Sequence, residues 1–153
     1  MTTTQCPIPN PQTCCIYPVE FKTQLVPPAL EGSFEVYDVS VDAVIEAVCP
    51  EKVIICGKVT KKYKYTSVKQ DGTRNPEWRT DERAFQCIID RDDADEGDPN
   101  DYVITGMAVL SKGYASLHNI SKMPDINHPG KTVNVFWSFR ETDLIKVCIR
   151  KRT

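Results

Sequence analysis

Apolar and polar residues alternate over much of the chain. Between positions 53 and 65, five odd-numbered residues are apolar, and the even positions from 58 to 66 are polar. A period of two residues is typical of a β-strand with one buried face. Lys61 interrupts the apolar series, so we expect its side chain either to extend its charged end into water or to lie at the rim of the sheet. The apolar residues are Val53, Ile55, Val59, Tyr63 and Tyr65.

The stretch from Val39 to Ala47 alternates in the same way and predicts a preceding strand. Phe34 and Val36 are out of phase with this stretch. A β-bulge inserts one extra residue into a strand and would restore the phase. We therefore predict a bulge near Tyr37–Asp38.

Turn signals follow at fairly regular spacing. Asp71-Gly72 predicts a hairpin, and Asn75-Pro76 is expected to lengthen its loop. The chain should then return as a strand over residues 83–90. One face of that strand would be formed by Phe85, Cys87 and Ile89.

The remainder of the chain predicts further strands. Residues 102–117 are expected to form one strand, kinked at Gly106 and Gly113. Residues 132–139 and 143–151 are expected to pair as a hairpin around Glu141-Thr142-Asp143. No segment has the period of an amphipathic helix. Short strands separated by turns predict an all-β fold, a single β-sandwich of jelly-roll-like form.

The first thirty residues differ from the rest because six of the eleven prolines lie there. Proline lacks a backbone donor and favours extended geometry. Residues 1–30 are therefore predicted to be an extended arm, and residues 31–153 the sandwich domain. The apolar stretch from Ile16 to Val26 could still add an edge strand to its own sheet or to that of a neighbouring molecule.

Composition excludes several classes of protein. A net charge of −2 over 153 residues gives no signature of nucleic-acid binding. No apolar run approaches the roughly 20 residues of a membrane span, and the N-terminal residues do not resemble a secretory signal peptide. Synthesis in a cytosol is expected. With two histidines and no catalytic or cofactor motif, we expect neither an enzyme nor a cofactor.

The acidic stretch from Asp90 to Asp101 is a candidate for a calcium site. Carboxylates suit calcium, and the weak candidate ligands are Asp93, Asp95 and Asp98. The calcium-loop pattern of EF-hands is absent. A solvated loop is the favoured interpretation, and no metal is expected.

The seven cysteines are the candidate chemistry of the chain. Adjacent residues are about 3.8 Å apart, whereas disulfides need Cα atoms about 4.4–6.8 Å apart. Cys14 and Cys15 are therefore expected to bond to different partners, on opposite sides of an extended strand. We predict intersubunit disulfides from Cys6, Cys14 and Cys15, with Cys49, Cys56, Cys87 and Cys148 as candidate partners. Unpaired thiols, a redox pair and a zinc site remain as alternatives, although spacings of the C-x₂₋₄-C kind are missing.

The central part of the chain resembles the SPOCS domain of spore coat and spore-envelope proteins of endospore-forming Firmicutes. The resemblance covers residues 21–151. It rests on Val53, Gly57, Val59, Lys61 and Tyr65 in the first strand of the motif, and on Phe85 and Ile89 in the second. Ala84 stands where the family often has proline.

This resemblance implies a structural protein of the spore surface, made in the mother cell. The chain has a single copy of the motif and a cysteine-bearing arm. We therefore predict self-assembly into a fibre or layer of coat, exosporium or appendage, with the protein itself and other coat proteins as partners. The alternative is a monomeric or dimeric binding module that recruits coat proteins or a glycan.

Overall fold

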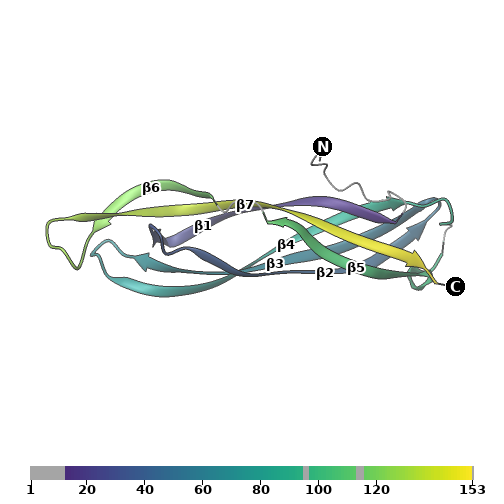
Figure 1. The fold of residues 1–153 in the computed structure, drawn as a ribbon, viewed down its shortest axis with the longest axis horizontal. Coiled ribbons are helices and arrows are strands. Elements are labelled where there is room, and N and C mark those ends of the chain that lie inside the picture. The colour runs from purple at the N-terminus through teal and green to yellow at the C-terminus, as the bar shows by residue number, and fades with distance from the viewer. Residues whose placement is uncertain (1–12, 95–96, 113–115, 153) are drawn as a thin grey trace, which may run out of the picture.

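The computed structural model describes residues 13–94, 97–112 and 116–152, and most of them lie in β-strands (Figure 1). The prediction of an all-β fold is confirmed. The strands are β1 (Cys14–Leu30), β2 (Glu35–Cys49), β3 (Lys52–Val68), β4 (Arg74–Asp90), β5 (Tyr102–Lys112), β6 (Ser116–Pro124) and β7 (Thr132–Lys151). A short 3₁₀ helix covers Pro99–Asp101.

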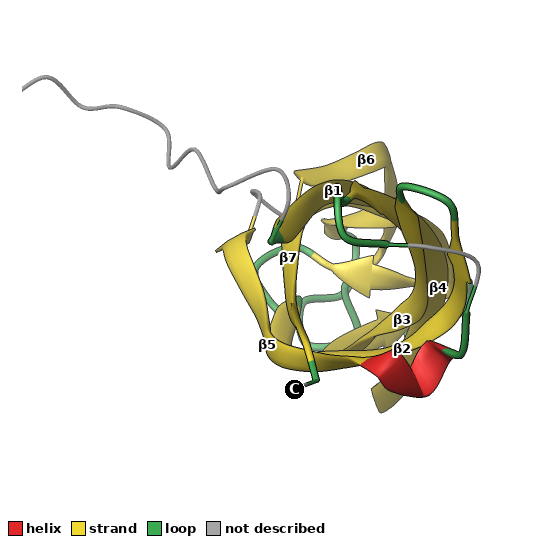
Figure 2. Ribbon diagram, turned by 90° about the vertical axis from the view of Figure 1, so that its right-hand side faces the viewer, coloured by secondary structure: helices red, strands yellow, loops and turns green. Residues whose placement is uncertain are grey.

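All seven strands belong to one antiparallel sheet that curls round like a barrel (Figure 2). Strands β2, β3 and β4 form a meander, with β3 in the middle. Strand β7 pairs with β1 along one edge, and its other edge is shared by β5 and β6. The pair Ala29 and Ser67 links β1 to β3. Because one sheet holds every strand, the finer prediction of a two-sheet sandwich is not confirmed.

The expected boundary at residue 30 is wrong for the part of the arm that the structure describes. Residues 14–30 form β1, which pairs with β7 from Cys14 opposite Cys148 to Leu30 opposite Val135. Phe21 and Leu25 of this strand are fully buried in the core. Prolines are tolerated in β1 because nearly all of its backbone pairing is with β7, along one edge. Its apolar residues supply a buried face. Residues 1–12 of the predicted arm lie outside the described residues.

Strand β7 corrects the predicted hairpin at residues 141–143. The strand runs without a turn from Thr132 to Lys151, and both Glu141 and Asp143 are buried on its inner face. Two acidic residues close together resembled a turn in the sequence. Their position in phase with buried Phe139 and Ile145 instead makes them part of the core.

The other local predictions divide between confirmed and wrong. The β2–β3 ladder shifts register between Val36 and Asp38, as the predicted bulge requires. Gly72, with φ of +88°, makes the predicted turn between β3 and β4. Asn75-Pro76 lies inside β4 and not in a loop. The expected strand over residues 102–117 is two strands, β5 and β6, and Gly113 lies outside the described residues.

The core lies inside the curled sheet, on the odd-numbered positions of β3 that the alternation picked out. They are joined by inward residues of β1, β4 and β7. Phe34 packs on the rings of Tyr63 and Phe139, with ring centroids 5.4 and 4.8 Å away. Burial raises the pKa of Tyr63 to about 12. The buried residues of this core include Val19, Phe21, Leu25, Val53, Ile55, Val59, Phe85, Cys87, Ile89, Ile145, Val147 and Ile149.

Lys61 is the largest departure from the sequence prediction. Its side chain is fully buried and not at the rim. Its Nζ lies 2.6 Å from Glu141 Oε2 and 2.8 Å from Asp143 Oδ2, and 4.1 Å from the centre of the Phe21 ring. These contacts join β3 to β7 across the interior. We call Lys61, Glu141 and Asp143 the buried triad.

The strands β1 and β4 face each other without a backbone ladder in the described part of the chain. Side chains of β4 close this seam instead. Arg79 donates a hydrogen bond to the carbonyl oxygen of Val26 (3.0 Å), and Arg83 donates to Thr23 Oγ1 (3.2 Å). Guanidinium groups thereby satisfy the Val26 carbonyl and the Thr23 hydroxyl at this unpaired strand edge.

The packing around Gly57 gives a test of this core. A Cβ at position 57 would lie 2.5 Å from the Asp42 carbonyl oxygen and 2.7 Å from the Phe85 ring. Overpacking of this kind typically costs about 1–3 kcal/mol. We expect Gly57→Ala to lower the free energy of unfolding by that amount, measured by denaturant titration. Gly106→Ala, which meets nothing within 4 Å, is the matched control and should be neutral or slightly stabilising.

Candidate assembly surface

A disulfide joins Cys14 of β1 to Cys148 of β7, two residues that face each other in the ladder. The neighbouring backbone bond, from the Ile149 amide to the Thr13 carbonyl, is 2.9 Å long. The cysteines therefore form a non-hydrogen-bonded pair, in which side chains of antiparallel strands come closest. Their Cα atoms are 4.1 Å apart.

A second disulfide joins Cys15 of β1 to Cys87 of β4. Successive residues of a strand point to opposite faces. Cys15 therefore points into the core, and Cys14 points to the outer face of the sheet. Cys87 lies on the buried face of β4, beside Phe85 and Ile89. The bond closes one end of the seam between β1 and β4. The prediction that adjacent cysteines bond to different partners on opposite sides is confirmed.

The structure corrects the expectation of intersubunit bonds for Cys14 and Cys15, because both disulfides lie within one chain. Cys87 and Cys148 were among the predicted partners. Cys49 and Cys56 are free thiols, and Cys6 lies outside the described residues. No group of metal-ligating side chains occurs among the described residues, so the alternative of a zinc site gains no support from them.

Cys56 lies on the outer face of the sheet, within an apolar cluster that we call the outer patch. Its members are Val44, Ile54, Cys56 and Ile88. The ladders place Val44 opposite Cys56 and Ile54 opposite Ile88. Val44 is 59% exposed and Ile88 is 52% exposed. Large aliphatic side chains gathered on a solvent face are typical of an interaction site.

Ion pairs border the outer patch along the strands. Lys52 pairs with Asp90 at 2.7 Å on one side, and Lys58 pairs with Glu82 at 3.4 Å on the other. The Gln86 side chain, opposite Cys56, also donates a hydrogen bond to Glu46 (2.9 Å) across β3, so the patch combines apolar and polar groups, as protein–protein interfaces do. A shallow hollow of about 240 Å³ lies next to Cys56, between β2 and β3.

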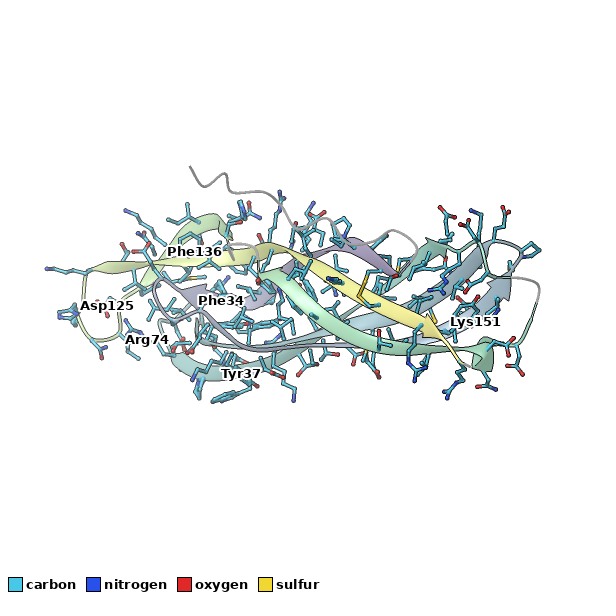
Figure 3. The ribbon with its side chains drawn as sticks, turned by 45° about the vertical axis from the view of Figure 1, so that its right-hand side comes forward. Phe34, Tyr37, Arg74, Asp125, Phe136 and Lys151 are labelled. Carbon is cyan, nitrogen blue, oxygen red and sulfur yellow. A yellow bond between two sulfur atoms is a disulfide. The ribbon has the colours of Figure 1, made fainter. Side chains whose placement is uncertain are left out.

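A second cluster on the same face is aromatic. Trp78 is 63% exposed and packs edge-on against Tyr37, with ring centroids 5.6 Å apart. Lys64 lies 5.2 Å from the Trp78 ring. Tyrosine and tryptophan are enriched at interfaces. Figure 3 shows Tyr37 at the outer margin of the molecule, pointing away from the interior.

An apolar groove of about 540 Å³ opens elsewhere, where β1, β3, β6 and β7 meet. Its apolar lining comprises Val26, Pro27, Pro28, Val68, Met123 and Trp137. The Trp137 indole donates a hydrogen bond to Ser121 Oγ (2.7 Å), which fixes the ring as one wall. The groove can take a small apolar or proline-containing ligand.

The acidic stretch is a structured loop where the structure describes it. Arg91 forms two 2.8 Å contacts with Asp93 and holds the pKa of that carboxyl well below its usual range. Asp98 accepts a hydrogen bond from the Asn100 amide at the start of the 3₁₀ helix. Both candidate calcium ligands have protein partners, and Asp95 lies outside the described residues.

Comparison with known proteins finds no family model, no curated protein and no solved structure that matches this chain. The resemblance to the SPOCS domain therefore stays a prediction. None of the helices among the described residues is long and apolar enough to cross a membrane.

The cysteine assignments can be tested directly. We expect alkylation of the folded, oxidised protein to label Cys56 and Cys49, and to leave Cys14, Cys15, Cys87 and Cys148 unlabelled until reductant is added. Peptide mapping by mass spectrometry reads out each site. Cys14 or Cys15 found in a peptide joined to another molecule would contradict the intrachain pairing.

Proposed function

We propose that this chain is the structural subunit of a self-assembling fibre or layer at the spore surface, and not an enzyme. The spore setting rests on the sequence resemblance alone. The observation that carries self-assembly is the outer patch, a cluster of exposed and half-exposed apolar side chains around the free thiol of Cys56. The partner is a second copy of this chain, together with other coat proteins.

The distribution of cysteines supports a rigid subunit with separate linking groups. Both disulfides hold β1 inside its own fold, and each contributes about 2–4 kcal/mol in the usual model. Three cysteines then remain: Cys6, Cys49 and Cys56. A thiol within an apolar contact is buried when two copies meet, and it can become a disulfide once the surroundings are oxidising. The proposed intersubunit link therefore uses Cys56, with Cys6 or Cys56 of another copy as its partner.

The outer face also supports association before any covalent link forms. Its aliphatic and aromatic clusters lie along the same three strands, β2, β3 and β4. Burial of apolar surface contributes about 25 cal/mol per Å². A contact through both clusters would remove Val44, Ile88 and Trp78 from water.

Electron microscopy of the purified protein tests the proposal. We expect regular fibres or lattices that withstand heat and detergent and loosen when reductant is added. Val44→Glu places a charge in the outer patch and should abolish or greatly shorten them. Ile126→Glu is the control, because Ile126 is similarly exposed (54%) but lies in the turn between β6 and β7.

Two outcomes would count against the proposal. Small dispersed particles at all concentrations, with and without reductant, would contradict self-assembly. Assemblies that form equally well from Val44→Glu would show that the subunits do not meet through the outer patch.

Cys56→Ser should leave the assemblies intact but make them sensitive to detergent.

A second candidate function is a small binding module, favoured by the groove beside Trp137. It predicts a monomer whose size does not change with concentration, and quenching or shifting of tryptophan fluorescence by a bound ligand. A proline-rich peptide is the suitable first probe, because aromatic side chains and prolines form the walls.

A further inference from the structure

The buried triad brings an amine and two carboxyl groups together in a site closed to water. Lys61 and Asp143 have no exposed side-chain surface, and the Glu141 side chain is 4% exposed. The three groups come from the middle of β3 and from two inward positions of β7. Phe21 of β1 covers the amine, with its ring centre 4.1 Å from Nζ.

The charges of the triad do not balance when all three groups are ionised. Two carboxylates against one ammonium leave a net negative charge in an apolar interior, which is costly. Burial raises the pKa of Glu141 above its ordinary value. The hydrogen bond and the charge of Lys61 lower this pKa, whereas the charge of Asp143 and a hydrogen bond with it raise it further. This shift favours the protonated form of Glu141, whose carboxyl group can then donate a hydrogen bond to Asp143.

We propose that Lys61 and Asp143 become joined by an intramolecular amide bond that forms spontaneously in the folded chain, with Glu141 as the proton-transfer group. This inference does not depend on the proposed function. It rests on the contact of Nζ with Asp143 Oδ2 at 2.8 Å, the adjacent Glu141 at 2.6 Å and the exclusion of water.

The first step is a proton transfer inside the triad. In water the ammonium and the carboxylate are each stabilised by solvent, but the apolar interior removes that solvation. The reaction requires a neutral amine beside a neutral carboxylic acid, and a proton passed from Lys61 to Asp143 across the 2.8 Å contact gives both. The amine nitrogen then carries the lone pair that the reaction requires.

The second step forms the bond. The Nζ lone pair attacks Cγ of Asp143, and the carbonyl electron pair moves to oxygen, which accepts a hydrogen bond from protonated Glu141. Glu141 then passes a proton from nitrogen to the leaving hydroxyl group. The carbon–oxygen bond breaks and one water molecule leaves. The balance is amine plus carboxylic acid to amide plus water, and no oxidant or other reactant is needed.

The fold supplies the main advantage for this reaction, which is fixed orientation. Groups held in place within one molecule react with effective molarities of about 10⁵–10⁸ M. Phe21 on one side and the core on the others prevent the amine from moving away. Asp143 is assigned as the acceptor because its side chain is fully buried in contact with Nζ, whereas Glu141 has the raised pKa of a proton donor.

Intact mass spectrometry of the full chain is the test. The protein is reduced, alkylated and denatured, so that disulfides do not affect the mass. We expect a mass lower by one water molecule than that of the sequence with all seven cysteines alkylated, and a branched peptide that joins Lys61 to Asp143. A mass equal to that of the fully alkylated sequence would overturn the proposal.

Conservative variants distinguish the two acids. Asp143→Asn should lose one ammonia in place of one water, because the amide nitrogen becomes the leaving group. Glu141→Gln should still lose water, but more slowly by about 10²-fold or more. Loss of ammonia from Glu141→Gln would show that Glu141 is the acceptor and would overturn the assignment to Asp143.

Lys61→Arg is the matched control, since it keeps a positive charge but cannot form the bond in this way. It should have its full sequence mass. Under reducing conditions in detergent it should also migrate more slowly than the wild-type chain, whose amide bond would close a large loop. Circular dichroism checks that each variant retains its strands. Equal migration of the wild-type and Lys61→Arg chains would contradict the amide bond independently of the mass.

Discussion

Burying a lysine with two carboxylates in a narrow apolar interior constrains the whole arrangement of the sheet. Strands β3 and β7 share no ladder in the described part of the chain, yet Lys61 must meet Glu141 and Asp143 at contact distance. A shift of either strand by one residue would turn its charged groups outward and its polar neighbours inward. An isolated buried charge costs several kcal/mol. The triad therefore fixes the register of two strands that no backbone hydrogen bonds connect.

The inward-facing residues of β4 differ from one end of the strand to the other. At the end that carries the second disulfide, β4 turns Phe85, Cys87 and Ile89 inward, and the core is apolar. From Arg83 to Arg79, on both sides of the level of Lys61, the inward positions of β4 hold charged residues. These side chains contact the backbone of β1 and replace a ladder there. The sheet is thus closed by a covalent bond at one end of the seam and by guanidinium groups further along.

The strands themselves could be predicted from the sequence because their period is local. Alternation from Val53 to Tyr65 indicated the buried face of β3 correctly, and the phase change at Val36 indicated the bulge. The intrachain disulfides could not be predicted, because they depend on β1 lying between β7 and β4, a matter of topology. The spacing of the cysteines showed only that Cys14 and Cys15 need different partners.

The buried triad could have been found from a signal that was present in the sequence. Glu141 and Asp143 continue the alternation of Phe139 and Ile145, and Lys61 continues that of Val59 and Tyr63. When residues of opposite charge on two strands are both in phase with buried residues, they are expected to form an ion pair inside the core. Taken one strand at a time, a lysine looks like the rim of a sheet and two acids look like a turn. The outer patch was not predicted from the sequence. Val44 and Ile88 are apolar residues on the exposed face of strands whose other face forms the core, and the alternation shows only which face is buried.

The bond between Cys14 and Cys148 also determines how the molecule responds to tension. The two cysteines are 134 positions apart in sequence but adjacent in space. A pulling force applied to the chain on the outer sides of these cysteines passes from one strand directly to the other through the sulfur atoms. The strands between them are bypassed and need not unfold or lengthen. While that bond is oxidised, the folded body behaves under load as an inextensible link.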